Sequence, residues 1–220
     1  MHICGVDEAG RGPVIGPLVV ASFSIIEEKI EDIESLGVKD SKKLTPKKRT
    51  KLFSEILELS GSHYFRILNP EYLNIEMKKQ TLNEIEAKAF IDAIIGLKVP
   101  LKRIICDSCD VNEMRFSDNI KEGIFDHYPE SEVIASHKAE DKYPIVAAAS
   151  ILAKVKRDEL LKKIEEEVGS PIGSGYPSDP STRRFLEEYY KRNNSFPSYV
   201  RLEWKTLKNI KDYQNQKKLV

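Results

Sequence analysis

Two adjacent carboxylates, Asp7 and Glu8, follow a short apolar run, and a turn of small residues around Arg11 comes directly after them. Hard divalent cations such as Mg²⁺ prefer oxygen ligands and are held by a few carboxylates together with substrate phosphates. Neighbouring side chains of a regular strand point to opposite faces. Asp7 and Glu8 therefore share one site only where the strand becomes irregular, and Gly10 permits that break. The pair predicts a divalent-metal site at a strand end.

A third carboxylate, Asp107, ends a second apolar run, residues 103–106, which is too short for a helix and is typical of a buried parallel strand. If this strand lies beside residues 2–7, Asp7 and Asp107 meet at one edge of the sheet. Clustered carboxylates repel one another, and a bound cation relieves the repulsion. The alternative is that Asp107 and Asp110 only end a strand and open a turn.

Other cofactor chemistries fit the sequence poorly. The spacing of Gly10, Gly12 and Gly16 is G-x-G-x-x-x-G, and a strand rather than a helix is expected next, which argues against a dinucleotide site. Cys106 and Cys109 form a C-x-x-C motif, but no second pair of ligands stands at a zinc-site spacing. Three cysteines are too few for a disulfide framework, so we expect a reducing, cytoplasmic location.

The composition is that of a globular protein with an uneven charge distribution. The chain has 220 residues, of which 40% are hydrophobic and 32% charged, and its net charge is zero. Residues 181–220 nevertheless hold ten Lys or Arg and four Asp or Glu, a net charge of +6. This segregation predicts a polyanionic partner, with a solvated amphipathic helix as the alternative. No apolar run approaches the ~18 residues of a membrane span, so we expect no membrane segment.

The hydrophobic patterns predict a mixed α/β fold. Strands are expected over residues 2–7, 18–26, 64–68, 103–106 and 132–136, with a hairpin formed by the first two. Helices are expected over residues 46–59, 82–97, 113–128 and 143–168, followed by a mostly helical basic segment. The alanine-rich start of the longest helix predicts close packing against the sheet.

Several sequence blocks together resemble a known family. In chain order they are VDEAGRGPVIGP, DSKKL, ICDS, HKAEDKYPIVAAASILAKVKRD and GSGYPSDPST. They run from Ile3 to about Thr206 and closely resemble ribonuclease HII, particularly its archaeal members. The resemblance implies a ribonuclease-H-like mixed sheet flanked by helices. It further implies a catalytic domain over residues 1–173 and a helical, substrate-binding C-terminal extension over residues 174–220.

The resemblance also implies an activity and a cofactor. Members of the family hydrolyse the RNA strand of RNA–DNA hybrids. They also cut on the 5′ side of single ribonucleotides in duplex DNA, leaving 3′-hydroxyl and 5′-phosphate ends. Four acidic residues hold two Mg²⁺ or Mn²⁺ ions for two-metal hydrolysis. Three of these acids match Asp7, Glu8 and Asp107.

The fourth acid is ambiguous because the family reads K-A-D-A-K-x-P where this chain has residues 138–144, KAEDKYP. An ungapped match places Glu140 at the acid position, with one methylene more than aspartate. A shifted register places Asp141 there, although Asp141 is also well placed to cap the following helix. We favour Glu140 and keep Asp141 as the alternative.

The same resemblance implies substrate contacts. The family's Gly-Arg-Gly stretch recognises the ribonucleotide, whose 2′-hydroxyl distinguishes RNA from DNA, and a family tyrosine packs on the neighbouring sugar. Lysines are candidate phosphate contacts. The substrate-binding residues expected here are Gly10, Arg11, Gly12, Tyr176, Lys42, Lys43 and Lys138.

Two other functions remain open: a junction resolvase that uses similar carboxylates, and a hybrid-binding module inactivated by the change at residue 140. The final residues, 212–220, are a weak candidate segment for docking to a replication clamp.

Overall fold

The computed structural model describes residues 1–38 and 45–217, with side chains omitted for Pro46 and residues 213–217. The strands are β1 (His2–Ala9), β2 (Leu18–Ile26), β3 (Ser62–Leu68), β4 (Leu101–Asp107) and β5 (Glu132–Ser136). The helices of the first half are η1 (Glu27–Lys29), α1 (Ile30–Ser35), α2 (Pro46–Leu59), α3 (Pro70–Glu76) and α4 (Leu82–Ile95). Those of the second half are α5 (Glu113–Gly123), α6 (Ala139–Lys142), α7 (Pro144–Val168), α8 (Pro180–Asn193) and α9 (Lys205–Lys217).

The chain folds into two compact units. The first contains residues 1–9, 19–67 and 81–156, and the second contains residues 10–18, 68–80 and 157–220. This partition reflects packing, whereas the predicted division at residue 173 concerns which part catalyses and which part binds substrate. That division of labour stays a prediction.

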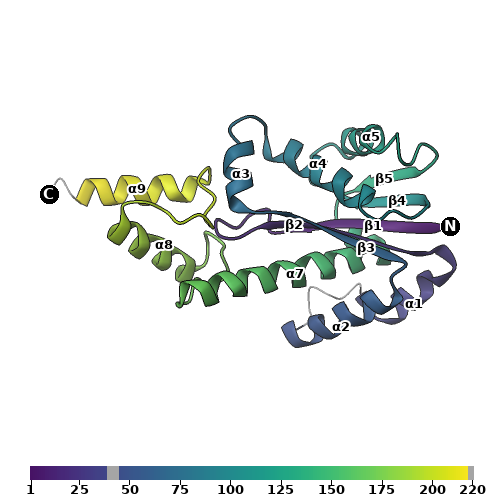
Figure 1. The fold of residues 1–220 in the computed structure, drawn as a ribbon, viewed down its shortest axis with the longest axis horizontal. Helices are drawn as coiled ribbons and strands as arrows, with labels where there is room; N and C mark the ends of the chain where they lie inside the picture. Colours follow the sequence, from purple (N-terminus) through teal and green to yellow (C-terminus); the bar gives the residue numbers. More distant parts are fainter. Residues whose placement is uncertain (39–44, 218–220) are drawn as a thin grey trace. The chain divides into compact units, whose positions relative to one another are not determined.

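One five-stranded mixed sheet organises the first unit, in the order β3-β2-β1-β4-β5 (Figure 1). β1 pairs antiparallel with β2, which confirms the predicted hairpin. β1 pairs in parallel with β4, and the register sets Val6 opposite Cys106. The next residue of each strand is an aspartate, so Asp7 and Asp107 stand at the same edge of the sheet. The mixed α/β fold is therefore confirmed.

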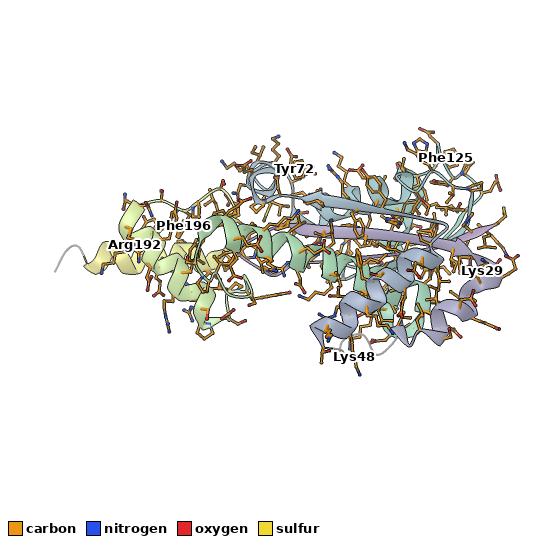
Figure 2. All side chains as sticks on the ribbon, turned by 60° about the horizontal axis from the view of Figure 1, so that its bottom comes forward. Lys29, Lys48, Tyr72, Phe125, Arg192 and Phe196 are labelled. Atoms are coloured by element: carbon orange, nitrogen blue, oxygen red, sulfur yellow. The ribbon has the colours of Figure 1, made fainter. Side chains whose placement is uncertain are left out.

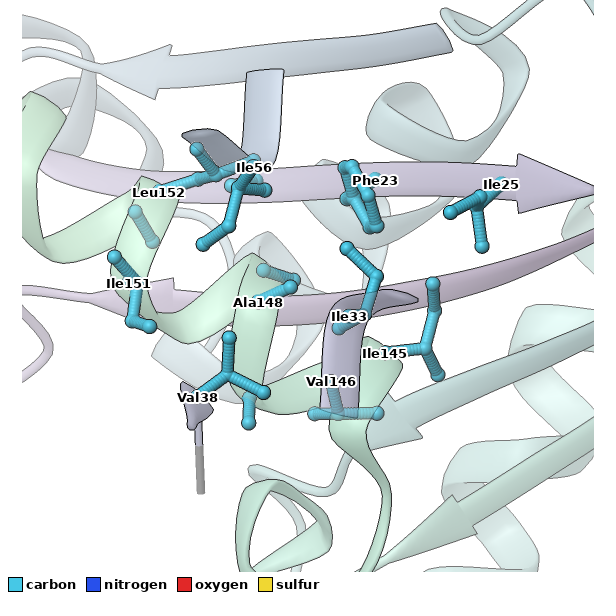
Figure 3. Close-up of a cluster of buried hydrophobic side chains, with 14 of the residues drawn as sticks. Phe23, Ile25, Ile33, Val38, Ile56, Ile145, Val146, Ala148, Ile151 and Leu152 are labelled. Atoms are coloured by element: carbon cyan, nitrogen blue, oxygen red, sulfur yellow. The ribbon is translucent and has the colours of Figure 1, made fainter. Parts of the chain in front are cut away.

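Helices cover both faces of this sheet. In Figure 1, α4 and α5 lie on one side, and α1, α2 and the first half of α7 lie on the other. Long charged side chains such as that of Lys48 on α2 point into solvent (Figure 2). Figure 3 shows the buried cluster in which Phe23 and Ile25 of β2 pack with Ala148 and Leu152 of α7.

The close approach of α7 to the sheet depends on small residues, as the alanine-rich sequence predicted. Ala147, Ala148 and Ala149 are completely buried. On the strand side, a Cβ added to Gly5 would lie 2.2 Å from the carbonyl oxygen of Ile145. Only glycine therefore permits the backbones of β1 and α7 to pack at this distance, and the contact fixes the N-terminal turns of α7 against the strand that carries Asp7.

The second unit has its own core, which includes Val14, Ile15, Leu186 and Val200. Residues 14–16 are held from two directions by backbone bonds. The N–H of Val14 donates to the oxygen of Gly175 across 2.8 Å, and the N–H of Gly16 donates to the oxygen of Tyr199 across 3.0 Å. The glycine-rich turn is thus built together with the C-terminal part of the chain. Among the described residues, no helix is long and apolar enough to span a membrane.

Some elements differ from the predictions. The helix expected over residues 113–128 ends at Gly123. α1, α3 and α6 were not predicted, because each has only four to seven residues and shows too little periodicity.

Candidate functional site

Three carboxylates meet at the carboxyl ends of β1 and β4. One oxygen of each of Asp7, Glu8 and Asp107 lies within 4.8 Å of those of the other two. Asp7 and Asp107 are brought together by the parallel register of their strands, and Glu8 follows where β1 is about to end. The backbone N–H of Glu8 donates to Oδ1 of Asp7 across 2.7 Å. The arrangement is a compact, oxygen-only group of acids.

Asp7 is the most shielded member of this group, with 4% of its surface exposed. Burial raises the pKa of its carboxyl well above the ordinary value, and the charges of Glu8 and Asp107 raise it further. A side-chain hydrogen bond from Ser150, on α7, acts in the opposite direction. Mutually repelling oxygens in a shielded position fit a divalent cation, which would replace repulsion with attraction.

Both candidates for the predicted fourth acid, Glu140 and Asp141, lie on α6, which is tied to the carboxylate group through its first residue. The backbone N–H of Ala139 donates to Oδ1 of Asp107 across 2.7 Å. Lys138 precedes it with a left-handed φ of 53°, an uncommon conformation for a residue with a side chain. Glu140 is buried and Asp141 is exposed. Glu140 is not among the three acids that lie within 4.8 Å of one another.

The predicted recognition residues Gly10, Arg11, Gly12 and Tyr176 all belong to the second unit. Gly10 has a φ of +97°, which disfavours any residue with a Cβ. Gly12 and Tyr176 face each other, because a Cβ on Gly12 would lie 3.4 Å from Cε1 of the tyrosine. Tyr176 is 39% exposed. The turn and the ring therefore form one partly open surface.

Three further lysines were predicted to contact substrate, and one of them lies in the described part of the chain. Lys138 is exposed next to α6. Lys42 and Lys43 lie outside the described residues. Ser150 lies in the HKAEDKYPIVAAASILAKVKRD block, and its contact with Asp7 is a tertiary feature that spacing along the chain does not reveal.

Comparisons with known proteins identify the family. A family model described as Ribonuclease HII matches residues 4–207. Ribonuclease HII of Thermococcus sibiricus is 50% identical over 218 residues, which cover 99% of this chain and 95% of that protein. The crystal structure of ribonuclease H2 from Pyrococcus horikoshii OT3 matches with a TM-score of 0.91 at 46% identity, covering 98% of this chain and 100% of that one.

Two further structures extend the comparison. The ribonuclease HII of Archaeoglobus fulgidus, solved in a complex with PCNA, has a TM-score of 0.84 at 40% identity and covers 93% of this chain and 96% of that one. Bst-RNase HIII, solved in complex with Mn²⁺, has a TM-score of 0.82 at 22% identity, with coverage of 98% and 71%, and shares the fold. Because the family model and the more similar relatives extend over nearly the whole sequence, the chain belongs to the ribonuclease HII family of RNase H-type endonucleases.

Proposed function

We propose that this protein hydrolyses the RNA strand of RNA–DNA hybrids and cuts on the 5′ side of single ribonucleotides in duplex DNA. The products carry 3′-hydroxyl and 5′-phosphate ends. The single observation that carries the proposal is the group of three carboxylates, Asp7, Glu8 and Asp107, whose oxygens lie within 4.8 Å of one another in a family of nucleases.

In this proposal Asp7, Glu8, Asp107 and Glu140 hold two Mg²⁺ or Mn²⁺ ions, with Asp141 as the alternative fourth acid. When bound, the ions supply positive charge that activates water and stabilises the leaving 3′-oxygen. The protein's own contribution is placement. The hydrogen bond from Ala139 holds one oxygen of Asp107, and the contact from Ser150 favours the ionised form of Asp7. Both keep oxygens oriented before substrate arrives.

Substrate is bound by the turn that follows Glu8. Ala9 alone separates Glu8 from Gly10 in the sequence, so the turn comes directly after two of the carboxylates along the chain. Backbone groups of residues 10–12 recognise the 2′-hydroxyl of the ribonucleotide, and Arg11 contacts a phosphate. Tyr176 packs on the adjacent deoxyribose. Lys42, Lys43 and Lys138 neutralise backbone charge.

The wider organisation follows from the same function. Residues 1–173 catalyse, and residues 174–220 bind substrate together with the turn. The proposed location is cytoplasmic. Because the Archaeoglobus fulgidus relative was solved in a complex with PCNA, we also propose that residues 212–220 dock to a replication clamp.

The proposal is tested with duplex DNA that contains one ribonucleotide, incubated with Mg²⁺ or Mn²⁺. A cut on the 5′ side of the ribonucleotide, with 3′-hydroxyl and 5′-phosphate ends, is the expected result. Cleavage of four-way DNA junctions instead would identify a resolvase. Binding of the ribonucleotide duplex without any cut, in either metal, would identify an inactive hybrid-binding module.

A further inference from the structure

Two arginines of the second unit are completely enclosed. Arg157 on α7 is 1% exposed, and Arg201, shortly before α9, is 0% exposed. Arginine is almost never fully buried unless it is paired. Both arginines stand in charged stretches of the sequence, KVKRD and YVRLEWK, so their burial calls for a physical explanation.

Arg201 holds the backbone of the glycine-rich turn. Its Nε donates to the oxygen of Gly16 across 2.8 Å, and its Nη1 donates to the oxygen of Arg11 across 3.3 Å. Its guanidinium lies 4.9 Å from the ring centre of Trp204, whose Nε1 donates to the oxygen of Gly12 across 3.0 Å. The carbonyl groups of the turn are thus drawn toward one stacked arginine–tryptophan pair.

The bond from Arg201 to the carbonyl of Arg11 also orients the N–H on the opposite side of the same peptide group, which belongs to Gly12. No peptide bond among the described residues is cis, and in a trans peptide the C=O and the following N–H point in opposite directions. Since the carbonyl of Arg11 points to Arg201, the N–H of Gly12 points away from the buried guanidinium. Gly12 itself is exposed, so the turn is accessible at this peptide.

Arg157 connects the turn with Tyr176. A Cβ on Gly10 would lie 2.6 Å from both Cδ and Nε of Arg157, so the arginine stem fills the space beneath this glycine. The guanidinium lies 5.5 Å from the ring centre of Tyr176. Its Nη2 makes one long bond, 3.4 Å, to the oxygen of Ser174. One side chain therefore contacts both parts of the predicted recognition surface.

The positive charge of the pair is only partly balanced. The nearest acid to Arg157 is Asp158, 3.8 Å away with a side chain that is 44% exposed, and within the described part of the chain Arg201 makes no ion pair. Nε of Arg157 and Nη2 of Arg201 are buried and find no acceptor among the described residues. Burial and the charge of Arg157 lower the pKa of Arg201 to about 9, so it is still charged at neutral pH.

We propose that Arg157 and Arg201 are positioning residues that fix the Gly10–Gly12 turn and the Tyr176 ring in one arrangement and bias that surface toward a nucleic-acid phosphate. The inference rests on the proposed function. Burial of two like charges side by side costs folding free energy. Their electrostatic potential extends to the turn through protein of low dielectric constant, where screening is weak. A phosphate at the turn would offset that cost, which gives the buried pair a function in substrate binding.

The first test measures binding by fluorescence anisotropy, in the Asp7→Asn background with Mg²⁺, to duplexes with and without one ribonucleotide. Arg157→Met is expected to raise the Kd for the ribonucleotide duplex about tenfold, or about 1.4 kcal/mol, and to reduce the preference over all-DNA duplex. Arg157→Lys restores much of that loss. The matched control is Lys29→Met at an exposed position of η1 (Figure 2), outside the turn, the loop that carries Tyr176 and the basic C-terminal segment; its Kd changes less than about twofold.

A double-variant cycle separates positioning from general stability. If Arg157 acts through Tyr176, the effects of Arg157→Met and Tyr176→Leu on Kd are less than additive, and the unfolding temperature of Arg157→Met does not fall. If Arg157→Met does not fold, Arg201→Lys is the variant that tests the inference. Lysine keeps the positive charge but lacks the planar guanidinium fork of arginine. Its Kd for the ribonucleotide duplex is expected to rise roughly tenfold.

Three results would overturn the inference. They are an unchanged Kd in a folded arginine variant, additive effects of Arg157→Met and Tyr176→Leu on Kd, and a rise in Kd that is explained by a loss of stability. Absence of cleavage by the wild-type enzyme would instead contradict the proposed function, and the binding measurements would still decide the role of the arginines.

Discussion

The backbone N–H of Ala139 donates a 2.7 Å hydrogen bond to Oδ1 of Asp107. This bond connects the end of β4 to the first residue of α6, so the segment that carries Asp107 is tied to the segment that carries both candidates for the proposed fourth acid. Because Glu140 is buried on α6 while Asp141 is exposed, the bond favours Glu140 as the acid directed toward the interior.

Glu140→Gln is therefore expected to lower kcat/KM about 100-fold, and Asp141→Asn less than about threefold. Glutamine keeps the length and shape of glutamate and loses only the charge, which a metal ligand needs. Steady-state cleavage of a duplex with one ribonucleotide measures both values. The reverse ranking would assign the fourth acid to Asp141.

Asp7→Asn is expected to abolish cleavage without loss of stability. Burial, followed by repulsion from Glu8 and Asp107, holds the pKa of Asp7 well above its ordinary value, so the metal-free fold gains from removal of this charge. The unfolding temperature should be equal to or higher than that of the wild type, and the stabilisation by added Mn²⁺ should shrink. Asp118→Asn, an exposed site on α5, is the control that should leave both properties unchanged. Retained cleavage in Asp7→Asn would refute the assignment.

Ser150→Ala is expected to shift the acidic limb of the pH–activity profile upward by roughly half to one pH unit. The hydrogen bond from Ser150 lowers the pKa of Asp7, so its loss lets protons compete with metal at a higher pH. Ser24→Ala is the control, because it removes a buried hydroxyl that donates to the oxygen of Ser62 and not to Asp7. Its pH–activity profile should match that of the wild type. Identical profiles for both variants would show that Ser150 does not tune Asp7.

Lys138→Gly and Lys138→Ala separate backbone strain from charge. The left-handed φ of 53° is costly for any residue with a Cβ, so the glycine variant should be about 1 kcal/mol more stable than the alanine variant in urea unfolding. Both lose the same charge, so KM for the ribonucleotide duplex should rise by the same few-fold factor. Equal stabilities would contradict the strain argument, and an unchanged KM would remove Lys138 from the substrate contacts.

Much of the fold was predictable because local signals agreed with the tertiary structure. Thr45 and Pro46 predicted the start of α2, where the Thr45 hydroxyl accepts from the N–H of Lys48. The same kind of signal was present in Asn69 and Pro70, where Asn69 caps α3, yet seven residues gave too little periodicity to be recognised. The apolar runs that end in Asp7 and Asp107 predicted both the strands and their shared edge.

The parts that escaped prediction depend on contacts between distant residues. α6 starts from a left-handed Lys138 and is held by Asp107, neither of which a local pattern reveals. The basic C-terminal segment indicated a polyanion partner through exposed charge. Burial of Arg201 beneath residues 11–16 appears only once residues 185 or more positions apart in the sequence are brought together.

Asp179 gives a pH-dependent test of the loop that carries Tyr176. Its carboxylate accepts bonds from the N–H and hydroxyl of Ser174 and from the N–H of Ser181. These bonds lower its pKa to about 2, below the roughly 3.9 of an unfolded aspartate. The folded state therefore binds this proton less readily, so the stabilisation is present above about pH 4 and is lost as the pH falls toward 2.

Asp179→Asn should consequently be less stable than the wild type at pH 7, with a difference that narrows between pH 4 and pH 2. Urea unfolding of both proteins at pH 7, 4, 3 and 2 gives the free energy of unfolding as a function of pH. Subtracting one curve from the other removes the contribution of all titrating groups that the two proteins share. Asp126→Asn, at an exposed position, should run parallel to the wild type. A constant difference across the whole range would mean that the Asp179 carboxylate is not held by these bonds, and that the loop bearing Tyr176 is ordered by other contacts.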